Sequence, residues 1–181
     1  MKWTTCMALV LTVVVGLLVG CASGPASRAE QNALLQEAAA TMEQMRAEDP
    51  TLGELVRRAY GYALFPKVTK GGLVVGGASG QGVVYERGQH VGYCDLSQAS
   101  VGLQAGAQTF GELLLFEDRS ALDRFRAGSL NFGADASAVM LESGVATNAT
   151  FVDGVAVVVR PISGAMLEAS IGGQQFSYRA K

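Results

Sequence analysis

Apolar positions in the first part of the chain recur at helical spacing. After residue 27 they fall three or four residues apart, at Leu34, Leu35, Ala38, Met42 and Met45. Ser27 and Glu30 have the spacing of a capping box, and Asp49-Pro50 is typical of a helix end. The pattern therefore predicts a helix within residues 27–50.

A second helical pattern follows directly. Thr51 and Glu54 repeat the capping-box spacing, and Pro66 is expected to end the helix. One apolar face continues through Leu52, Leu55, Val56, Ala59, Tyr60, Ala63 and Leu64. The pattern predicts a helix over residues 51–64.

From Gly71 onward the pattern changes to short β-prone segments separated by glycine-rich turns. The expected strands are 73–75, 83–85, 90–93, 101–108, 113–116, 139–141, 155–159 and 166–171. A short helix is predicted over 119–126, with Leu122 and Phe125 inward, and Asp153-Gly154 marks a hairpin turn. Glycine inside strands indicates bulges, corners or close backbone approach. The predicted fold is α+β: two N-terminal helices on a strongly curved, glycine-rich antiparallel β-sheet or barrel-like sandwich.

Composition narrows the class of protein. The 181 residues are 49% hydrophobic and 17% charged, which is typical of one folded domain. A net charge of −2 argues against a nucleic-acid partner. Three cysteines and one histidine cannot supply a conventional four-ligand zinc site, so we expect no metal.

The N-terminus has the pattern of a bacterial lipoprotein signal. Lys2 precedes an uncharged apolar stretch over residues 8–19, which leads into the lipobox sequence LVGC that ends at Cys21. We expect residues 1–20 to be a signal peptide, Cys21 to carry diacylglyceryl and fatty-acid groups such as palmitate, and 21–26 to form a tether. The alternative is an ordinary signal peptide or uncleaved anchor in which Cys21 is incidental.

The lipobox also predicts a location. Ala22 stands after the cysteine where Asp would favour inner-membrane retention, so we expect an outer-membrane lipoprotein that faces the periplasm or the cell surface. Cleavage would leave Cys94 as the one unmodified thiol, and its place in a strand-like run predicts that it is buried.

Sequence motifs give little support to catalysis. The glycine run 76–82 lacks the Gly-Lys-Ser/Thr of a phosphate loop, and β-type residues follow it, so a tight β-turn is the favoured interpretation. A hydrolase would have to use His90, and no Gly-x-Ser-x-Gly elbow frames a serine. We expect a protein that is not an enzyme and that needs no cofactor.

Positive charge gathers in one stretch of this acidic chain. Between Leu55 and Tyr85 no acidic residue occurs, and the basic residues are Arg57, Arg58, Lys67 and Lys70. From charge alone they are either contacts for an anionic membrane or a solvated helix face.

Several blocks, taken in order, resemble the SYLF lipid-binding domain. They are residues 65–72 (FPKVTKGG), 76–82 (GGASGQG), 97–108 (SQASVGLQAGAQ), 132–136 (FGADA) and 164–170 (GAMLEAS). The resemblance covers roughly residues 52–178, and we take residues 51–181 as the SYLF-like domain. Eukaryotic members bind phosphoinositides and membranes, partly through a basic amphipathic helix, and some bind actin.

The resemblance implies a lipid-binding module without catalytic residues. Its basic helix matches residues 51–64, so Arg57, Arg58, Lys67 and Lys70 become head-group candidates. Leu52, Leu55 and Val56 either insert into the membrane or pack in the core. A bacterial envelope ordinarily lacks phosphoinositides and actin, so the expected ligand is another anionic phospholipid unless a host membrane is met. The alternative is a structural envelope protein that mediates protein contacts or self-association.

Overall fold

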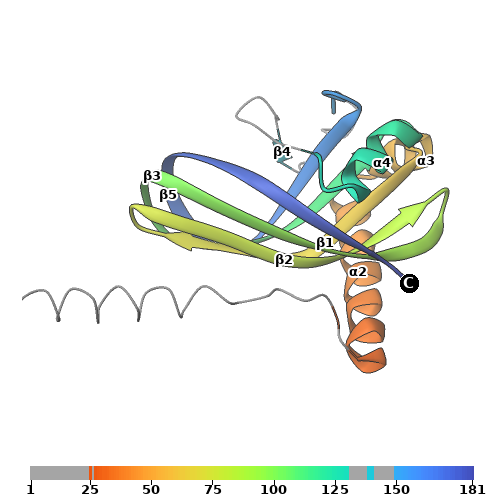
Figure 1. Cartoon of the computed structure of the whole chain (residues 1–181), viewed down its shortest axis with the longest axis horizontal. Coiled ribbons are helices and arrows are strands. Elements are labelled where there is room, and N and C mark those ends of the chain that lie inside the picture. Colours follow the sequence, from red (N-terminus) through yellow and green to blue (C-terminus); the bar gives the residue numbers. More distant parts are fainter. Residues whose placement is uncertain (1–24, 26, 131–137, 141–148) are drawn as a thin grey trace, which may run out of the picture.

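The computed structural model describes residues 25, 27–130, 138–140 and 149–181 (Figure 1). The predicted signal peptide, Cys21 and the 132–136 block of the SYLF resemblance lie outside the described residues. Both hydrophobic clusters of the core are built from residues between Leu34 and Phe176. A chain of residues 22–181 therefore keeps every core contact that the structure describes.

The first predicted helix is confirmed. Helix α2 spans Arg28–Glu48, and Asp49 caps its C-terminus. Its capping box is formed: the Glu30 N–H donates to Ser27 Oγ at 3.2 Å, and the Ser27 N–H donates to Glu30 Oε2 at 3.0 Å. Four backbone donors at a helix start lack partners within the helix, and this exchange binds one of them while anchoring the cap residue.

The second predicted helix is much shorter than expected. Helix α3 spans Leu52–Arg58, and its N-cap Thr51 makes no side-chain cap hydrogen bond. The Thr51 hydroxyl instead donates to Asp49 Oδ1 at 2.6 Å. Beyond Arg58 the helix prediction is wrong, because strand β1 occupies Gly61–Gly72 and Pro66 lies inside it at a register shift.

The error has a physical cause in residues 63–65. These consecutive apolar residues continue a helical face, but a strand buried on both sides gives the same run. Leu64 enters the hydrophobic cluster beneath α2 and α3, whereas Ala63 and Phe65 enter the cluster on the opposite face of the sheet. Strand β1 therefore places apolar side chains on both faces of the sheet.

The remaining elements form one sheet and a further helix. Strand β2 spans Val75–Glu86, β3 spans Gln89–Phe116, β4 spans Ala138–Met140 and β5 spans Val155–Ala180. The sheet order is β1-β2-β3-β5-β4, and β1 also pairs with β3. Helix α4 spans Arg119–Arg126 and buries Leu122 and Phe125, as predicted.

The long strands β3 and β5 determine the shape of the sheet. They pair antiparallel from Gly92↔Ala180 to Phe116↔Val155. The first part of β3 pairs with β2 and its last part pairs with β1, so the ribbon folds over the hairpin of β1 and β2 (Figure 1). The predicted separate segments within 90–116 and within 155–171 are thus continuous strands.

The α+β class and the strongly curved antiparallel sheet are confirmed. Over the residues that the structure describes, the sheet is not closed into a barrel, so the barrel-like alternative is wrong. The short β4 is the exception to antiparallel pairing, since it runs parallel to β5.

Turn predictions had mixed outcomes. The Asp153-Gly154 turn is confirmed: both residues have positive φ, and Val152 bridges to Val155. The glycine run 76–82 is not a turn, because it lies within β2. Close approach explains part of it: a Cβ at Gly82 would lie 2.7 Å from the Leu64 carbonyl oxygen. The predicted strand 73–75 is instead mostly the turn between β1 and β2, with Leu73 and Val74 outside both strands.

Candidate functional site: basic side chains and a groove beneath helix α2

Arg57 and Arg58 are exposed at the last turn of α3. Arg57 forms an ion pair with Glu54, one helical turn earlier. Such exposed pairs contribute little stability, so both guanidinium groups stay accessible to an anionic partner. The apolar residues of the same helix, Leu52, Leu55 and Val56, are buried in the core and do not form an insertion face.

Lys67 and Lys70 lie on opposite faces of β1. Side chains alternate along a strand, and here Lys67 and Thr69 are exposed whereas Val68 and Lys70 are buried. Lys70 is 9% exposed, on the side of the sheet away from α2. The expectation that it joins an exposed head-group patch is therefore wrong.

Lys67 lines a groove between α2 and the sheet. The groove has a volume of about 380 Å³, and its polar lining includes Glu37, Thr41, Lys67, Thr109, Arg160 and Ser163. Arg160 enters from β5, and its Nε donates to Glu48 Oε1 at 2.7 Å. Two cations and several hydroxyl groups therefore converge in one open groove.

Lys70 belongs to a different group of polar side chains, on the face of the sheet opposite α2, which we call the inner face. Glu112 is fully buried there, and Gln174 Nε2 donates to its Oε2 at 3.2 Å. Burial raises the pKa of Glu112 to about 7, and the hydrogen bond from Gln174 and the charge of Lys70 oppose that rise. This group is enclosed, so it favours a structural role.

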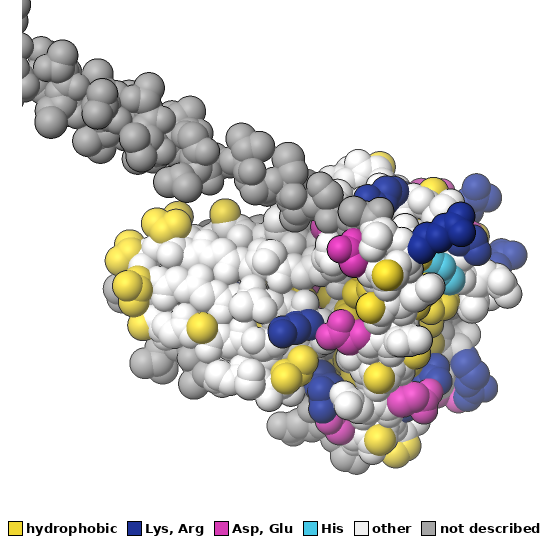
Figure 2. Space-filling view, turned by 90° about the horizontal axis from the view of Figure 1, so that it is seen from below, with side chains coloured by type: hydrophobic (Ala, Val, Ile, Leu, Met, Phe, Trp, Pro, Cys, Tyr) yellow, Lys and Arg dark blue, Asp and Glu magenta, His cyan; other side chains and the backbone are white. Residues whose placement is uncertain are grey.

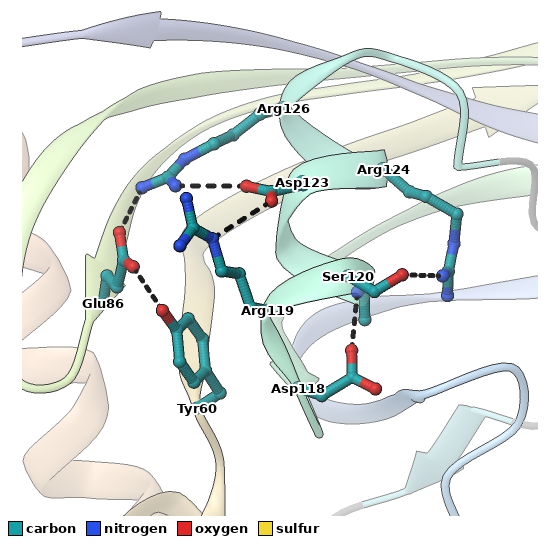
Figure 3. Close-up of polar contacts among 9 residues, drawn as sticks. Tyr60, Glu86, Asp118, Arg119, Ser120, Asp123, Arg124 and Arg126 are labelled. Carbon is teal, nitrogen blue, oxygen red and sulfur yellow. Dashed lines mark hydrogen bonds and ion pairs between the residues drawn. The ribbon is translucent and has the colours of Figure 1, made fainter.

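A further polar network joins α4 to the start of the sheet (Figure 3). Glu86 accepts hydrogen bonds from the Tyr60 hydroxyl at 2.8 Å and from Arg126 Nη2 at 2.7 Å. These two hydrogen bonds, that from Arg126 first, hold the pKa of Glu86 below its ordinary value. The Arg126 guanidinium also lies 5.3 Å from the centre of the Tyr178 ring. Each charged group at the centre of this network has a partner, as in a structural ion-pair cluster.

His90 and Cys94 lie in surroundings that do not resemble a nucleophile site. His90 packs between Tyr85 and Tyr93, its Nε2 lies 3.0 Å from the Gly92 carbonyl oxygen, and burial lowers its pKa. Cys94 is 1% exposed, as predicted, and burial raises the pKa of its thiol. Among the residues the structure describes, no group of three or more His, Cys, Asp and Glu could hold a metal ion.

Sequence reasoning missed Arg160 and Glu112. Arg160 follows an apolar run nearly a hundred residues after Lys67, and only the pairing of β5 with β3 brings the two to one groove. Glu112 does carry a weak signal, because it interrupts the otherwise uncharged stretch 96–116 at an inward position of the strand.

No protein-family model and no curated protein sequence matches this chain. Within the described ranges, no helix is both long and apolar enough to cross a membrane.

Proposed function

We propose that the chain is a membrane-anchored, non-catalytic lipoprotein that binds anionic phospholipid head groups. Cys21 carries the lipid anchor, and the ligand's phosphate lies in the groove between α2 and the sheet. The SYLF resemblance and the lipobox support the class of function. The single observation that supports the site is the convergence of Lys67, Arg160 and hydroxyl groups in that groove.

The groove has the chemistry that a phosphate requires. The ammonium group of Lys67 and the guanidinium group of Arg160 attract the charge, and hydroxyl groups of Thr41, Thr109 and Ser163 can donate hydrogen bonds to its oxygens. Glu37 at the same groove repels a bare anion, so a ligand with a cationic or hydroxyl-bearing part beside the phosphate fits best. Arg57 and Arg58 act at longer range, by attracting the chain toward an anionic leaflet.

The test is sedimentation of residues 22–181, which lack Cys21, with neutral and anionic phospholipid vesicles across a salt series. We expect selective binding to anionic vesicles that weakens as salt rises, because exposed charges are screened over about 8 Å at 0.15 M. Binding that is absent, or equal for both vesicle types, would overturn the head-group assignment. A stable protein partner recovered by cross-linking in intact envelopes would then favour the structural alternative.

Charge reversals locate the contact. Lys67→Glu and the pair Arg57→Glu with Arg58→Glu should each weaken anionic binding, by about fivefold per cation removed. Arg28→Glu is the matched control, because Arg28 is exposed in the first turn of α2, nine residues before Glu37. Circular dichroism of each variant verifies that the fold is kept.

A further inference from the structure

The turn between β1 and β2 carries a cluster of exposed aliphatic side chains, which we call the apolar tip. Its members are Leu73, Val74, Val75 and Val101, exposed by 71%, 64%, 69% and 63%. Val75 pairs with Val101 across β2 and β3, so the four form one patch. Figure 2 shows such side chains at the end of the sheet away from α2. Isolated exposed aliphatic residues are ordinary, but a contiguous cluster at a protruding end indicates a contact surface.

The two strands that carry the tip are uncharged near it, and the nearest charged positions along β1 and β5 are Lys70 and Glu168, which pairs with Gln104. Residues 71–84 and 96–111 contain no Asp, Glu, Lys or Arg. The charged side chains visible in Figure 2 lie toward the other end, around α2. A surface that meets water or a polar protein rim ordinarily carries charges, whereas a charged side chain that enters lipid costs several kcal/mol.

The backbone of the tip is also suited to an apolar medium. The Gly102 N–H donates to the Val74 carbonyl oxygen at 2.9 Å, and the Leu73 N–H donates to the Val75 carbonyl oxygen at 3.4 Å. Hydrocarbon offers no hydrogen-bond partners, so a segment that enters it needs its backbone groups paired within the protein. These two bonds meet part of that need at the turn itself.

The shape of the tip favours a bilayer over a protein partner. A protein would need a pocket to receive a protruding turn, whereas the fluid acyl region of a bilayer needs only an apolar tip. The tip lies away from the point where the N-terminal segment reaches the domain. Pro25 accepts a hydrogen bond from Arg179, whose strand partner Tyr93 precedes Val101 by eight residues, or about 26 Å of strand. The tip and Pro25 are thus separate points on the molecule.

We propose that the apolar tip inserts into the acyl region of a phospholipid bilayer. The inference rests on the proposed membrane role, but it concerns a different surface and a different force. The groove provides head-group selectivity that salt weakens. The tip provides apolar burial, which depends little on head-group charge or on salt.

A fluorescent reporter tests the insertion directly. Cys94 is buried and residues 22–181 lack Cys6 and Cys21, so Val74→Cys introduces the accessible thiol for a polarity-sensitive dye. With vesicle-bound protein we expect a blue-shifted, brighter emission that spin labels on the lipid acyl chains quench. Ser79→Cys is the matched control, because Ser79 is exposed on β2 four residues beyond Val75, and its dye should stay in water. Equal emission from the two sites on bound protein would overturn the proposal.

A binding measurement separates this proposal from the head-group assignment. The variant Leu73→Ser, Val74→Ser and Val75→Thr changes exposed positions only, so its fold should be kept. At high salt, where the charge contribution is screened, we expect its vesicle binding to fall by about tenfold or more. Lys67→Glu should change high-salt binding little and low-salt binding strongly.

The outcomes are distinguishable. Tip insertion without selectivity for anionic vesicles would retain this inference and overturn the head-group assignment. Selective binding to anionic vesicles without tip insertion would overturn this inference alone. If the chain binds no vesicle, both are wrong. Analytical ultracentrifugation adds one further outcome: self-association of the native chain that the tip variant abolishes, without a dye shift on vesicles, would assign the tip to a second copy.

Discussion

Gln174 and Glu112 make a hydrogen bond of 3.2 Å although 62 residues separate them in the chain. They are not strand partners, because Glu112 pairs with Val159 and Gln174 pairs with Gln98. Their side chains instead meet on the inner face of the sheet, where its curvature brings two parts of the β3–β5 ribbon together. The Glu112 carboxyl group therefore lies in the interior, where the hydrogen-bond donor that the structure describes for it is the neutral Gln174 amide.

This arrangement predicts that stability falls as the pH rises from about 4.5 to about 7. Burial raises the pKa of folded Glu112 from 4.5 to about 7, so the folded chain holds a proton that the unfolded chain releases. The stabilising contribution of the proton is complete below pH 4.5 and is lost as the pH rises through about 7. The shift corresponds to about 3 kcal/mol in the free energy of unfolding.

Urea unfolding of the native chain and of Glu112→Gln across this pH range checks the prediction. The neutral amide imitates the protonated carboxyl, so the two chains should be similar at acid pH. Above neutrality the variant should be more stable, by up to about 3 kcal/mol. A stability difference that does not change with pH would show that Glu112 does not titrate in this range.

Close packing of β1 on β2 predicts a strong effect of one added methyl group. A Cβ at Gly82 would lie 2.7 Å from both the Leu64 carbonyl oxygen and Phe65 Cδ1, and these buried groups cannot move without disturbing the core. Gly82→Ala should lower the free energy of unfolding by about 1–3 kcal/mol. Gly53→Ala in helix α3 is the control. A Cβ at Gly53 would have no atom within 4 Å, so this substitution should raise the free energy of unfolding by about 0.5–1 kcal/mol. Equal effects at the two sites would contradict the close approach.

Local signals in the sequence predicted what depends on neighbouring residues. The capping box of Ser27, the helix that buries Phe125 and the turn at Asp153 are set by contacts within a few positions, and all are confirmed. Residues 59–64 could not be assigned in this way. Their apolar spacing suits a helix, and only pairing with strands β2 and β3 makes them a strand.

The candidate site was predictable only in part, for the same reason. The basic stretch can be recognised in the sequence. The side chains of strand β1 alternate, however, so Lys67 is exposed on the α2 side of the sheet and Lys70 is buried on the opposite side. The apolar tip was assigned to a strand because Leu73-Val74-Val75 has high β-propensity, and exposure of such residues at a turn is a tertiary feature.

The contacts of Glu86 predict a measurable contribution to stability. Glu86→Ala would remove the partner of both Tyr60 and Arg126, whose side chain is only 24% exposed. Because the largely buried Arg126 guanidinium would lose this carboxylate, the free energy of unfolding measured by chemical denaturation should fall by about 1–3 kcal/mol. Arg119→Ala breaks the pair with Asp123, where the arginine side chain is 76% exposed, and should change stability by less than about 0.5 kcal/mol. A larger loss in the Arg119 variant would contradict this ranking.

Lys67 and Lys70 are three residues apart in sequence but face opposite sides of the sheet, which predicts that substitutions at the two positions act on different properties. Lys67→Gln should weaken binding to anionic vesicles and leave the titration of Glu112 unchanged, because Lys67 lies on the α2 side of the sheet. Lys70→Gln should leave vesicle binding unchanged, since its side chain is buried on the inner face.

Lys70→Gln should instead raise the pKa of Glu112, because the charge of Lys70 lowers that pKa in the native chain. The loss of stability with rising pH would then be larger and would continue to a higher pH. Vesicle sedimentation and urea unfolding across pH, applied to both variants, measure the two properties independently. Weaker vesicle binding by a folded Lys70 variant would show that the inner face communicates with the membrane surface and would contradict the separation of the two lysines.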